Sequence, residues 1–258
     1  MSEFLNVAVK AAKAAGKIHL KYFDKDLKTK SKGRSFDLVT VADTETEKRI
    51  VSEIRSFFPD HNFLGEEDTY KKTGSKYTWI IDPLDGTNNF AHHVPIFCVS
   101  IALAKGDEVI LGVIYDVTRN ELFHTEKGKG AFLNKKRISV SSAENLRKAI
   151  LITGFYYDRG DEMVMTLDTV KRFLELQVMG IRRFGAAALD LCNIACGRAS
   201  GFWEFLLNPW DFAAGKLLVE EAGGRVTGPK GEDIGLKPSF LIASNGKIHS
   251  KMLEIINR

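Results

Sequence analysis

The feature that most constrains the fold is the stretch from residue 62 to residue 140, where short runs of β-forming residues follow one another. Polar or glycine-containing turns separate the runs, which is typical of an antiparallel sheet. The runs are NFLG, YTWIID, FCVSIALA, VILGVIYD, ELFHTE and AFL. We therefore predict an antiparallel sheet over this part of the chain.

Helical patterns precede this stretch. Residues 3–23 repeat apolar side chains at helical spacing, which predicts a first helix. A second helix is predicted to begin near Asp43, where acidic residues suit the N-terminal end of the helix dipole, and to end at Pro59. Residues 24–36 are polar, basic and glycine-containing, so we expect a loop between the two helices.

The pattern changes near residues 141–148, after which strand-like and helical segments alternate. The strand-like segments are AILIT, WEFLL and SFLIAS, and the helices are expected at 161–176, 186–196, 210–222 and 246–257. Alternation of this kind is typical of an α/β unit. Because no linker rich in Pro, Gly or Ser divides the halves, we predict two subdomains that share an interface. They are an N-terminal α+β subdomain with the antiparallel sheet at 1–142 and a C-terminal α/β subdomain at 143–258.

Composition narrows the class of protein. The chain has 258 residues, 44% hydrophobic and 27% charged, with 37 Lys+Arg against 33 Asp+Glu and a net charge of +4. These values are typical of globular proteins and exclude disordered or fibrous ones. Three cysteines cannot form a disulfide framework, and lysines interrupt the apolar N-terminal run. We therefore expect a cytoplasmic protein without a membrane span, and a charge too weak to indicate nucleic acid by itself.

The most informative motif follows an apolar strand at residues 79–81. Asp82 and Asp85 stand three positions apart after the strand, and Gly86 and Thr87 permit a tight bend into a helix. Two carboxylates spaced in this way can converge on a hard cation, which prefers oxygen ligands. The backbone N–H groups of Gly86 and Thr87 can receive a phosphate at the same place. The alternative is that both aspartates only form turns, since Asp-Pro and Asp-Gly are common turn pairs.

The wider sequence resembles a known family. DPLDGTNNF at 82–90 resembles the first signature of the inositol monophosphatase superfamily, and PWDFAAG at 209–215, continuing into 220–224, is similar to the second. Residues 37–43, 65–67 and 185–191 are similar to further family blocks in the same order. The resemblance covers essentially the whole chain, and its details are most similar to the bacterial branch called extragenic suppressor proteins.

This resemblance implies a layered α-β-α-β-α sandwich of the sugar-phosphatase type, usually a homodimer. It implies a Mg²⁺-dependent, lithium-sensitive hydrolase of phosphate monoesters, with inositol 1-phosphate as the favoured substrate. The alternatives are a related sugar, histidinol or nucleotide phosphatase, or a regulatory protein that binds the transcription machinery. Asn88-Asn89-Phe90 speaks against the nucleotidase branch, which usually has Lys-Glu-Phe there. An association with RNA polymerase is part of the regulatory alternative, and we expect no nucleic acid and no membrane as partners.

The resemblance also assigns metal ligands. Glu66, Asp82 and the backbone carbonyl of Leu84 would hold a first Mg²⁺. Asp82, Asp85 and Asp211 would hold a second, and Glu66 would help to bind a third, which gives two to three ions per site. The sequence shows no Ser–His–Asp or Cys–His nucleophile, so a metal-activated water is the natural route to hydrolysis.

Catalytic and substrate-binding residues follow in the same way. Thr87, supported by Asp43, would orient the attacking water, with Glu66 as the third catalytic residue. The substrate contacts implied are Lys32, Asp85, Gly86, Thr87, Gly185, Ala186, Ala187, Glu204 and Asp211. The bulky stretch 152–158 stands near the expected substrate rim and departs from what an inositol-selective site suggests.

Several of these residues also have structural interpretations. Glu66 fits a solvated acidic turn, and Asp43 and Asp211 fit helix caps. Glu204 lies in an apolar run, where an unpaired carboxylate is costly, so substrate contact is favoured.

Other polar residues are interpreted more simply. The basic run 25–34 is either a solvated loop or an electrostatic funnel for an anionic substrate. His92 and His93 are expected in a loop, and Cys192 and Cys196 in a helix core. For Arg182 and Arg183 an interface and an ion pair both stay open.

Overall fold

The computed structural model describes residues 2–25, 30–31, 38–39, 41–155 and 160–258, with no description of the side chains of 30–31 and 38–39. The α-helices of this part are α1 (Glu3–Phe23), α2 (Val41–Arg55), α3 (Thr87–Ala91), α4 (Asp161–Glu175), α5 (Ala187–Ala195), α6 (Pro209–Glu221) and α7 (His249–Ile256). The strands are β1 (Lys30–Ser31), β2 (Leu38–Val39), β3 (Asn62–Gly65), β4 (Tyr77–Asp85), β5 (Cys98–Lys105), β6 (Glu108–Asp116), β7 (Glu121–Glu126), β8 (Ala131–Leu133), β9 (Lys136–Arg137), β10 (Ile150–Thr153), β11 (Gly180–Arg182), β12 (Gly201–Leu207), β13 (Arg225–Thr227) and β14 (Ser239–Ser244).

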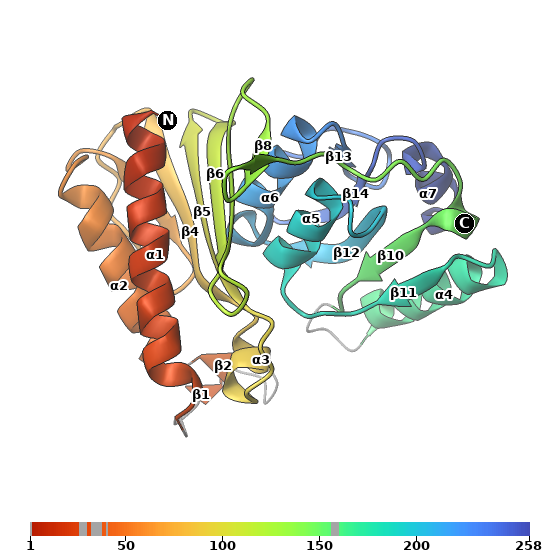
Figure 1. Ribbon diagram of the computed structural model, residues 1–258, viewed down its shortest axis with the longest axis horizontal. Helices are drawn as coiled ribbons and strands as arrows, with labels where there is room; N and C mark the ends of the chain where they lie inside the picture. Colours follow the sequence, from red (N-terminus) through yellow and green to blue (C-terminus); the bar gives the residue numbers. More distant parts are fainter. Residues whose placement is uncertain (1, 26–29, 32–37, 40, 156–159) are drawn as a thin grey trace.

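Five layers lie side by side in Figure 1. Helices α1 and α2 cover the outer face of a seven-stranded sheet, and α5 and α6 lie between that sheet and a five-stranded sheet. Helices α4 and α7 cover the far face of the second sheet. This arrangement confirms the predicted α-β-α-β-α sandwich. None of the described helices is both long and apolar enough to cross a membrane.

The seven-stranded sheet has the order β3-β4-β5-β6-β7-β8-β9. All its neighbours pair antiparallel except β3 and β4, which pair parallel, so the prediction of a purely antiparallel sheet was wrong at this edge. Residues 66–76 return the chain to the starting end before β4, which a tight hairpin cannot do. The register places Gly65 opposite Ile81, so Glu66 and Asp82, the next residues, emerge together at one edge.

The five-stranded sheet has the order β11-β10-β12-β14-β13. Strand β10 pairs parallel with β11 and β12, whereas β14 pairs antiparallel with β12 and β13. The predicted helices of this half are confirmed within a few residues of their expected ends, and so are the three predicted strands. The three-residue strands β11 and β13 were not predicted.

Three large apolar cores and one small cluster hold the described layers together. One lies under α1 and α2, with Ile50, Trp79 and Ile101 buried. Another lies under α4 and α7 around Trp203. The largest surrounds α5 and α6 and includes residues of both sheets, such as Ile80. Because this core is shared between the sheets, the division into subdomains at residue 142 stays a prediction.

Candidate active site

A cavity of about 130 Å³ lies between the two sheets where β4, α3, α5, β12 and α6 meet. Most of the site residues expected from the sequence share this cavity. Those that line it are Glu66, Asp82, Leu84, Asp85, Gly86, Thr87, Gly185, Ala186, Ala187, Glu204 and Asp211. We call it the acid-lined cavity.

Asp82 is the most buried carboxyl group of this cavity. Its exposed fraction is 2%, and Oδ1 accepts a hydrogen bond of 3.0 Å from the backbone N–H of Leu84. Burial raises the pKa of Asp82 well above its ordinary value, and the charges of Glu66, Asp85 and Asp211 raise it further. Glu66 follows the paired strand β3 and lines the cavity beside Asp82.

Asp85 acts as a distant cap for helix α5. Its Oδ1 accepts from the N–H of Ala187 at 3.2 Å, and its Oδ2 accepts from the N–H of Ala188 at 2.7 Å. The cap residue of the helix itself, Ala186, has no side chain for this purpose. Burial raises the pKa of Asp85 to about 6, although the backbone donors oppose the shift.

Asp211 is held in a similar way at the start of α6. Its Oδ2 accepts a hydrogen bond of 2.6 Å from the backbone N–H of Asn208, in a reciprocal capping box. The predicted cap role of Asp211 is therefore present in the structure. A carboxylate oxygen that accepts one N–H keeps a further lone pair, so capping leaves the carboxylate able to bind a cation.

Thr87 joins α3 to α2. Its hydroxyl oxygen lies 2.9 Å from Oδ1 of Asp43 and 2.9 Å from the carbonyl oxygen of Leu84. A hydroxyl has one proton, so donation to Asp43 leaves the Leu84 carbonyl with both lone pairs. Gly86 precedes the helix at φ 93°, and a Cβ there would lie 2.8 Å from the carbonyl oxygen of Ile96, so only glycine fits this bend.

Glu204 forms the opposite wall of the cavity from strand β12. Burial raises the pKa of its carboxyl group to about 8; Arg183 opposes this shift and Asp85 adds to it. The side chain packs against the Cα of Gly154, where any Cβ would collide with the carboxylate. A bulge follows in β12, and Leu206 takes a left-handed φ of 57° that brings it to the rim.

The structure groups the predicted site residues with two qualifications. Asp43 does not line the cavity but is fully buried behind Thr87, to which it is hydrogen-bonded. Lys32 lies outside the described residues, as does most of the basic run. His92 and His93 are exposed and face backbone carbonyls instead of the cavity, as expected.

Several lining residues were not predicted. The metal ligands, catalytic residues and substrate contacts expected from the sequence did not include Asn88, Gly154, Phe155, Arg183, Leu206, Leu207, Asn208 and Trp210. Trp210 and Asn208 could have been found from their place beside Asp211. Phe155 belongs to the bulky stretch expected near the rim, and it does line the cavity, whereas residues 156–159 are outside the described part.

His19 on α1 is a further residue that sequence patterns did not reveal. It is fully buried, and its Nε2 lies 2.9 Å from the carbonyl oxygen of Pro83. In the sequence Pro83 stands between Asp82 and Leu84. Because a carbonyl can only accept, Nε2 carries the proton. Burial lowers the pKa of His19 to about 4, so the ring is a neutral support for the loop.

The donor set of the acid-lined cavity fits a hard divalent cation. The candidate metal ligands are carboxylates and one backbone carbonyl, and Mg²⁺ prefers oxygen ligands of these kinds. Among the described residues no three acidic, histidine or cysteine side chains already converge on one point. The carboxylates of Asp85 and Asp211 instead accept from backbone N–H groups at helix starts. Burial and the neighbouring acids raise the pKa of Asp82 and Asp211, so compensating positive charge would be favourable.

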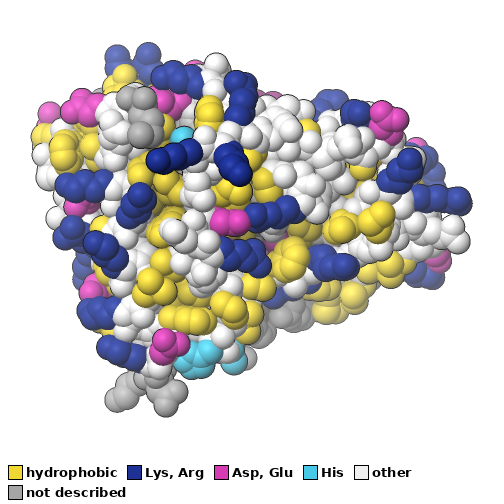
Figure 2. All heavy atoms as spheres, viewed as in Figure 1, with side chains coloured by type: hydrophobic (Ala, Val, Ile, Leu, Met, Phe, Trp, Pro, Cys, Tyr) yellow, Lys and Arg dark blue, Asp and Glu magenta, His cyan; other side chains and the backbone are white. Residues whose placement is uncertain are grey.

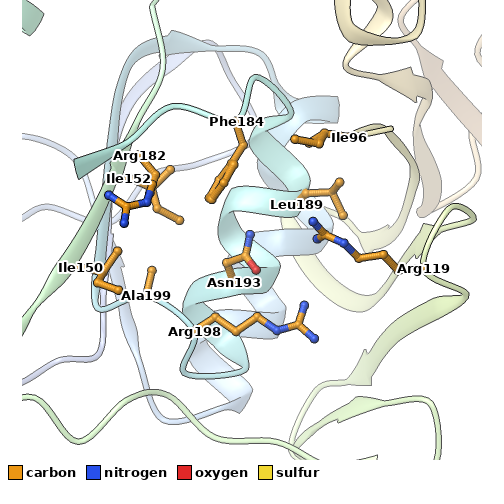
Figure 3. A pocket seen from close by; sticks show the side chains of 10 residues that line it. All are labelled: Ile96, Arg119, Ile150, Ile152, Arg182, Phe184, Leu189, Asn193, Arg198 and Ala199. Atoms are coloured by element: carbon orange, nitrogen blue, oxygen red, sulfur yellow. The ribbon is translucent and has the colours of Figure 1, made fainter. Parts of the chain in front are cut away.

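A second, larger cavity of about 370 Å³ lies at the edge of the five-stranded sheet. Figure 3 shows Arg182 beside Ile150 and Ile152, with Arg119 and Arg198 across from them. We call it the arginine-lined cavity. Arg198 is paired with Glu121 through Nη1 at 2.7 Å, and Arg119 lies 3.8 Å from Asp116. Arg182 and Arg183, which are adjacent in sequence, lie at different sites: Arg182 lines this cavity and Arg183 lines the acid-lined cavity.

Basic side chains do not form a continuous track on the face drawn in Figure 2. Lys and Arg are scattered among apolar and uncharged atoms there. Nucleic-acid-binding faces concentrate basic side chains along a patch or stripe. This face therefore gives no support to nucleic acid as a partner.

Comparison with known proteins agrees with the resemblance found in the sequence. The model of the inositol monophosphatase family matches residues 1–258. Inositol-1-monophosphatase of Synechocystis sp. is 41% identical over 99% of this chain and 89% of its own length. Nus factor SuhB of Pseudomonas aeruginosa is 40% identical over 99% of this chain and 96% of its own length.

Solved structures show the same fold. The extragenic suppressor protein suhB of Bartonella henselae has a TM-score of 0.95 and 39% identity, with 100% of this chain and 99% of that chain covered. An IMPase/NADP phosphatase solved with Mg²⁺ and phosphate has a TM-score of 0.87 and 27% identity, over 99% and 95% of the two chains. By sequence over its full length and by structure, the chain belongs to the inositol monophosphatase family.

Proposed function

We propose that this protein is a Mg²⁺-dependent hydrolase of phosphate monoesters, with inositol 1-phosphate as its best substrate. The observation that carries the proposal is Asp82, 2% exposed and surrounded by three other carboxyl groups that raise its pKa. Such a cluster is costly unless a cation compensates it. Membership of a phosphatase family supports the same chemistry.

The ligands would divide between two principal ions. Glu66, Asp82 and the Leu84 carbonyl would hold the first, and Asp82, Asp85 and Asp211 the second, with Glu66 also reaching a third. When bound, Mg²⁺ lowers the pKa of a coordinated water and neutralises charge on the phosphate. The hydrogen bond from Thr87 to Asp43 supports this division because it leaves the Leu84 carbonyl available.

Thr87 would orient the attacking water. Its proton goes to the buried Asp43 carboxylate, so its oxygen accepts a hydrogen bond from water and directs a water lone pair at phosphorus. The P–O bond to the alcohol then breaks, and the leaving oxygen takes up the proton that the water releases. The backbone N–H groups of Gly86 and Thr87 would contact the phosphate.

The alcohol portion would lie toward α5 and β12. The Gly185–Ala187 backbone and Glu204 line that side of the cavity, together with Arg183 and Phe155. At pH 7 a carboxyl group with a pKa of about 8 is mostly protonated, so Glu204 can donate or accept a hydrogen bond to a hydroxyl. This environment favours a polyhydroxylated substrate such as a cyclitol or sugar.

The test is a phosphate-release screen with Mg²⁺ over cyclitol, sugar, histidinol and nucleotide monophosphates. We expect inositol 1-phosphate to give the highest kcat/KM and EDTA to abolish release. A higher kcat/KM for another of these compounds would keep the phosphatase activity but refute inositol 1-phosphate as the best substrate. No release from any of these compounds would refute the proposed function.

A regulatory role in transcription is the second candidate. The observation that favours it is the 40% identity, over nearly the full length, to a relative named Nus factor SuhB. For either role we propose a cytoplasmic location, which the free thiols of Cys98, Cys192 and Cys196 support. Co-purification with RNA polymerase that survives loss of catalysis would establish the regulatory role, and its absence would leave the phosphatase alone.

We also propose that the protein is a homodimer. Strand β11 is the outer strand of its sheet, and Met179 immediately before it is 64% exposed. An unpaired edge with apolar side chains beside it is suited to association. Light scattering should give twice the mass of 28.8 kDa, and Met179→Asp should reduce it toward the monomer.

A further inference from the structure

The buried face of α2 carries a second acidic residue one turn after Asp43. Glu47 has no exposed surface, although glutamate is among the residues least often fully buried. Asp43 faces the hydroxyl of Thr87, whereas Glu47 faces the chain that follows β3. The helix thus presents one carboxylate to each of two segments that carry proposed catalytic residues.

Three hydrogen bonds hold Glu47 to the segment after β3. Its Oε2 accepts from the backbone N–H of Glu67 at 3.0 Å, and its Oε1 accepts from the N–H of Asp68 at 2.9 Å. The hydroxyl of Tyr70 donates to the same Oε1 at 2.8 Å. Two consecutive backbone amides and one side chain are therefore fixed by a single carboxylate.

Gly65 makes this approach possible from the other side. A Cβ at this position would collide with the carboxylate of Glu47, so the contact requires a glycine here. Residue 66 is therefore flanked by contacts to Glu47 on both sides, at Gly65 and at Glu67. The single residue between them is Glu66, which lines the acid-lined cavity together with Asp82.

The partners of Glu47 suit a carboxylate that orients a neighbouring metal ligand, because they are two backbone N–H groups and a hydroxyl instead of a lysine or arginine. Within the described part of the chain Glu47 makes no ion pair, so these three donors compensate its burial. A conventional structural glutamate on the same helix is Glu53, which pairs with Lys10 at 2.5 Å and Arg49 at 3.0 Å. The contrast separates a positioning role from simple stabilisation.

We propose that Glu47 is a positioning residue for the metal site: it fixes the backbone around Glu66 so that this carboxylate faces Asp82. The inference rests on the proposed function, since Glu66 is taken as a Mg²⁺ ligand. Residues that orient metal ligands typically change metal affinity by about 10- to 100-fold when they are replaced. Glu47 should therefore matter for Mg²⁺ affinity even though it touches no ion.

The first test measures Mg²⁺ binding by calorimetry without substrate. Glu47→Gln keeps the size of the side chain but turns one acceptor into an NH₂ group that faces a backbone N–H. We expect Kd for Mg²⁺ to rise at least ~10-fold. The matched control is Glu53→Gln, which should lower Tm by losing two ion pairs while Kd stays within about twofold.

A second measurement needs no metal. Hydrogen exchange of at least one of the Glu67 and Asp68 amides in EDTA should be at least ~10-fold faster in Glu47→Gln than in the parent, because the glutamine keeps only one acceptor oxygen. Glu53→Gln should leave these two amides unchanged. If Glu47→Gln does not fold, Tyr70→Phe removes one donor and keeps both backbone bonds, and it should raise Kd by about threefold.

A double-mutant cycle separates action through Glu66 from a general loss of stability. In the Glu66→Gln background, adding Glu47→Gln should change Kd by less than about twofold, because the ligand it positions is already lost. Additive losses, or an unchanged Kd in Glu47→Gln (in Tyr70→Phe if that variant replaces it), would overturn the inference. A parent that binds Mg²⁺ with this dependence but hydrolyses nothing would refute only the proposed function, and a parent that binds no Mg²⁺ would refute both.

Discussion

The arginine-lined cavity and the acid-lined cavity differ in how their charged groups are compensated. The arginine-lined cavity has about 370 Å³ and the acid-lined cavity about 130 Å³, so a comparison of these two by size alone favours the former. Yet the cations of the larger cavity are exposed, and two of them have acidic neighbours, Glu121 and Asp116. In the smaller cavity the carboxyl groups raise one another's pKa.

This difference shows where the fold carries an energetic cost. An exposed ion pair is worth little in water and loses little when it is broken. Carboxyl groups buried next to each other are unfavourable until a cation binds, so such a cluster indicates a site for a cation. The comparison predicts that changes in the acid-lined cavity alter catalysis and metal-dependent stability, whereas changes in the arginine-lined cavity alter neither strongly.

The largest effect is expected for Asp82→Asn. The asparagine Oδ1 can still accept from the Leu84 N–H, but one ligand charge of both proposed ions is lost. We expect kcat to fall at least ~10³-fold, equivalent to ~4 kcal/mol of transition-state stabilisation. Steady-state phosphate release measures this, and near-parental turnover would contradict the assignment.

The effect of Asp82→Asn on the melting temperature should have opposite signs without and with Mg²⁺. In EDTA it should melt at or slightly above the parent temperature, because repulsion around residue 82 is relieved. With Mg²⁺ the parent should melt higher, since it alone gains the full binding energy. A metal-free Asp82→Asn protein that fails to fold would show that Asp82 serves the fold instead.

Lithium gives the next effect. A site built from Asp82, Asp85 and Asp211 selects small hard cations by oxygen ligands alone, and the family resemblance implies that Li⁺ replaces the second Mg²⁺. We expect millimolar Li⁺ to remove most of the activity at fixed Mg²⁺. A sodium chloride series at matched ionic strength is the control, and equal activities in the two salts would count against this second site.

Glu204 should produce a smaller effect, on the pH dependence of stability. Its pKa is raised from 4.5 to about 8, so the folded state binds more protons than the unfolded state between these values. Its stabilisation is complete below the lower pKa and is lost as pH rises to the upper one. From pH 5 to 8 in EDTA, the parent Tm should fall on the order of 10 °C more than that of Glu204→Gln, at ~2–4 °C per kcal/mol. Parallel curves would show that Glu204 ionises normally.

The smallest effect is expected in the arginine-lined cavity. Arg198→Ala removes the ion pair with Glu121, whose partners are 41% and 18% exposed. We expect a stability loss of about 1 kcal/mol or less and kcat/KM within about twofold of the parent. Urea unfolding and phosphate release check both, and a tenfold loss of activity would remove the distinction between the cavities.

The sequence predicted the long periodic helices because apolar spacing repeats over many residues, whereas the order of the layers was implied by the resemblance to the family. It could not predict the parallel pairing of β3 with β4, since four residues such as NFLG carry no directional signal. Strands β11 and β13 are too short to show alternation. Helix α1 shows a similar limit: its pattern predicted the helix but not that His19 supports Pro83.

For the site, local motifs predicted which acids gather but not how they are held. Asp82 and Asp85 stand in one motif, so their proximity is a matter of spacing. The bond from Ala188 to Asp85 joins residues 103 positions apart, and no local pattern encodes it. Arg182 and Arg183 are adjacent in sequence yet line different cavities, and β11 ends between them.

The cap that Asp85 forms on α5 has a consequence for how such a protein can diversify. Asp85 both caps a helix and lines the acid-lined cavity, so replacing it to change substrate specificity would also destabilise the fold. Phe155 and Leu206 line the same cavity and cap no helix. Relatives that act on other substrates should therefore differ at Phe155 and Leu206 before they differ at the acidic residues of the cavity.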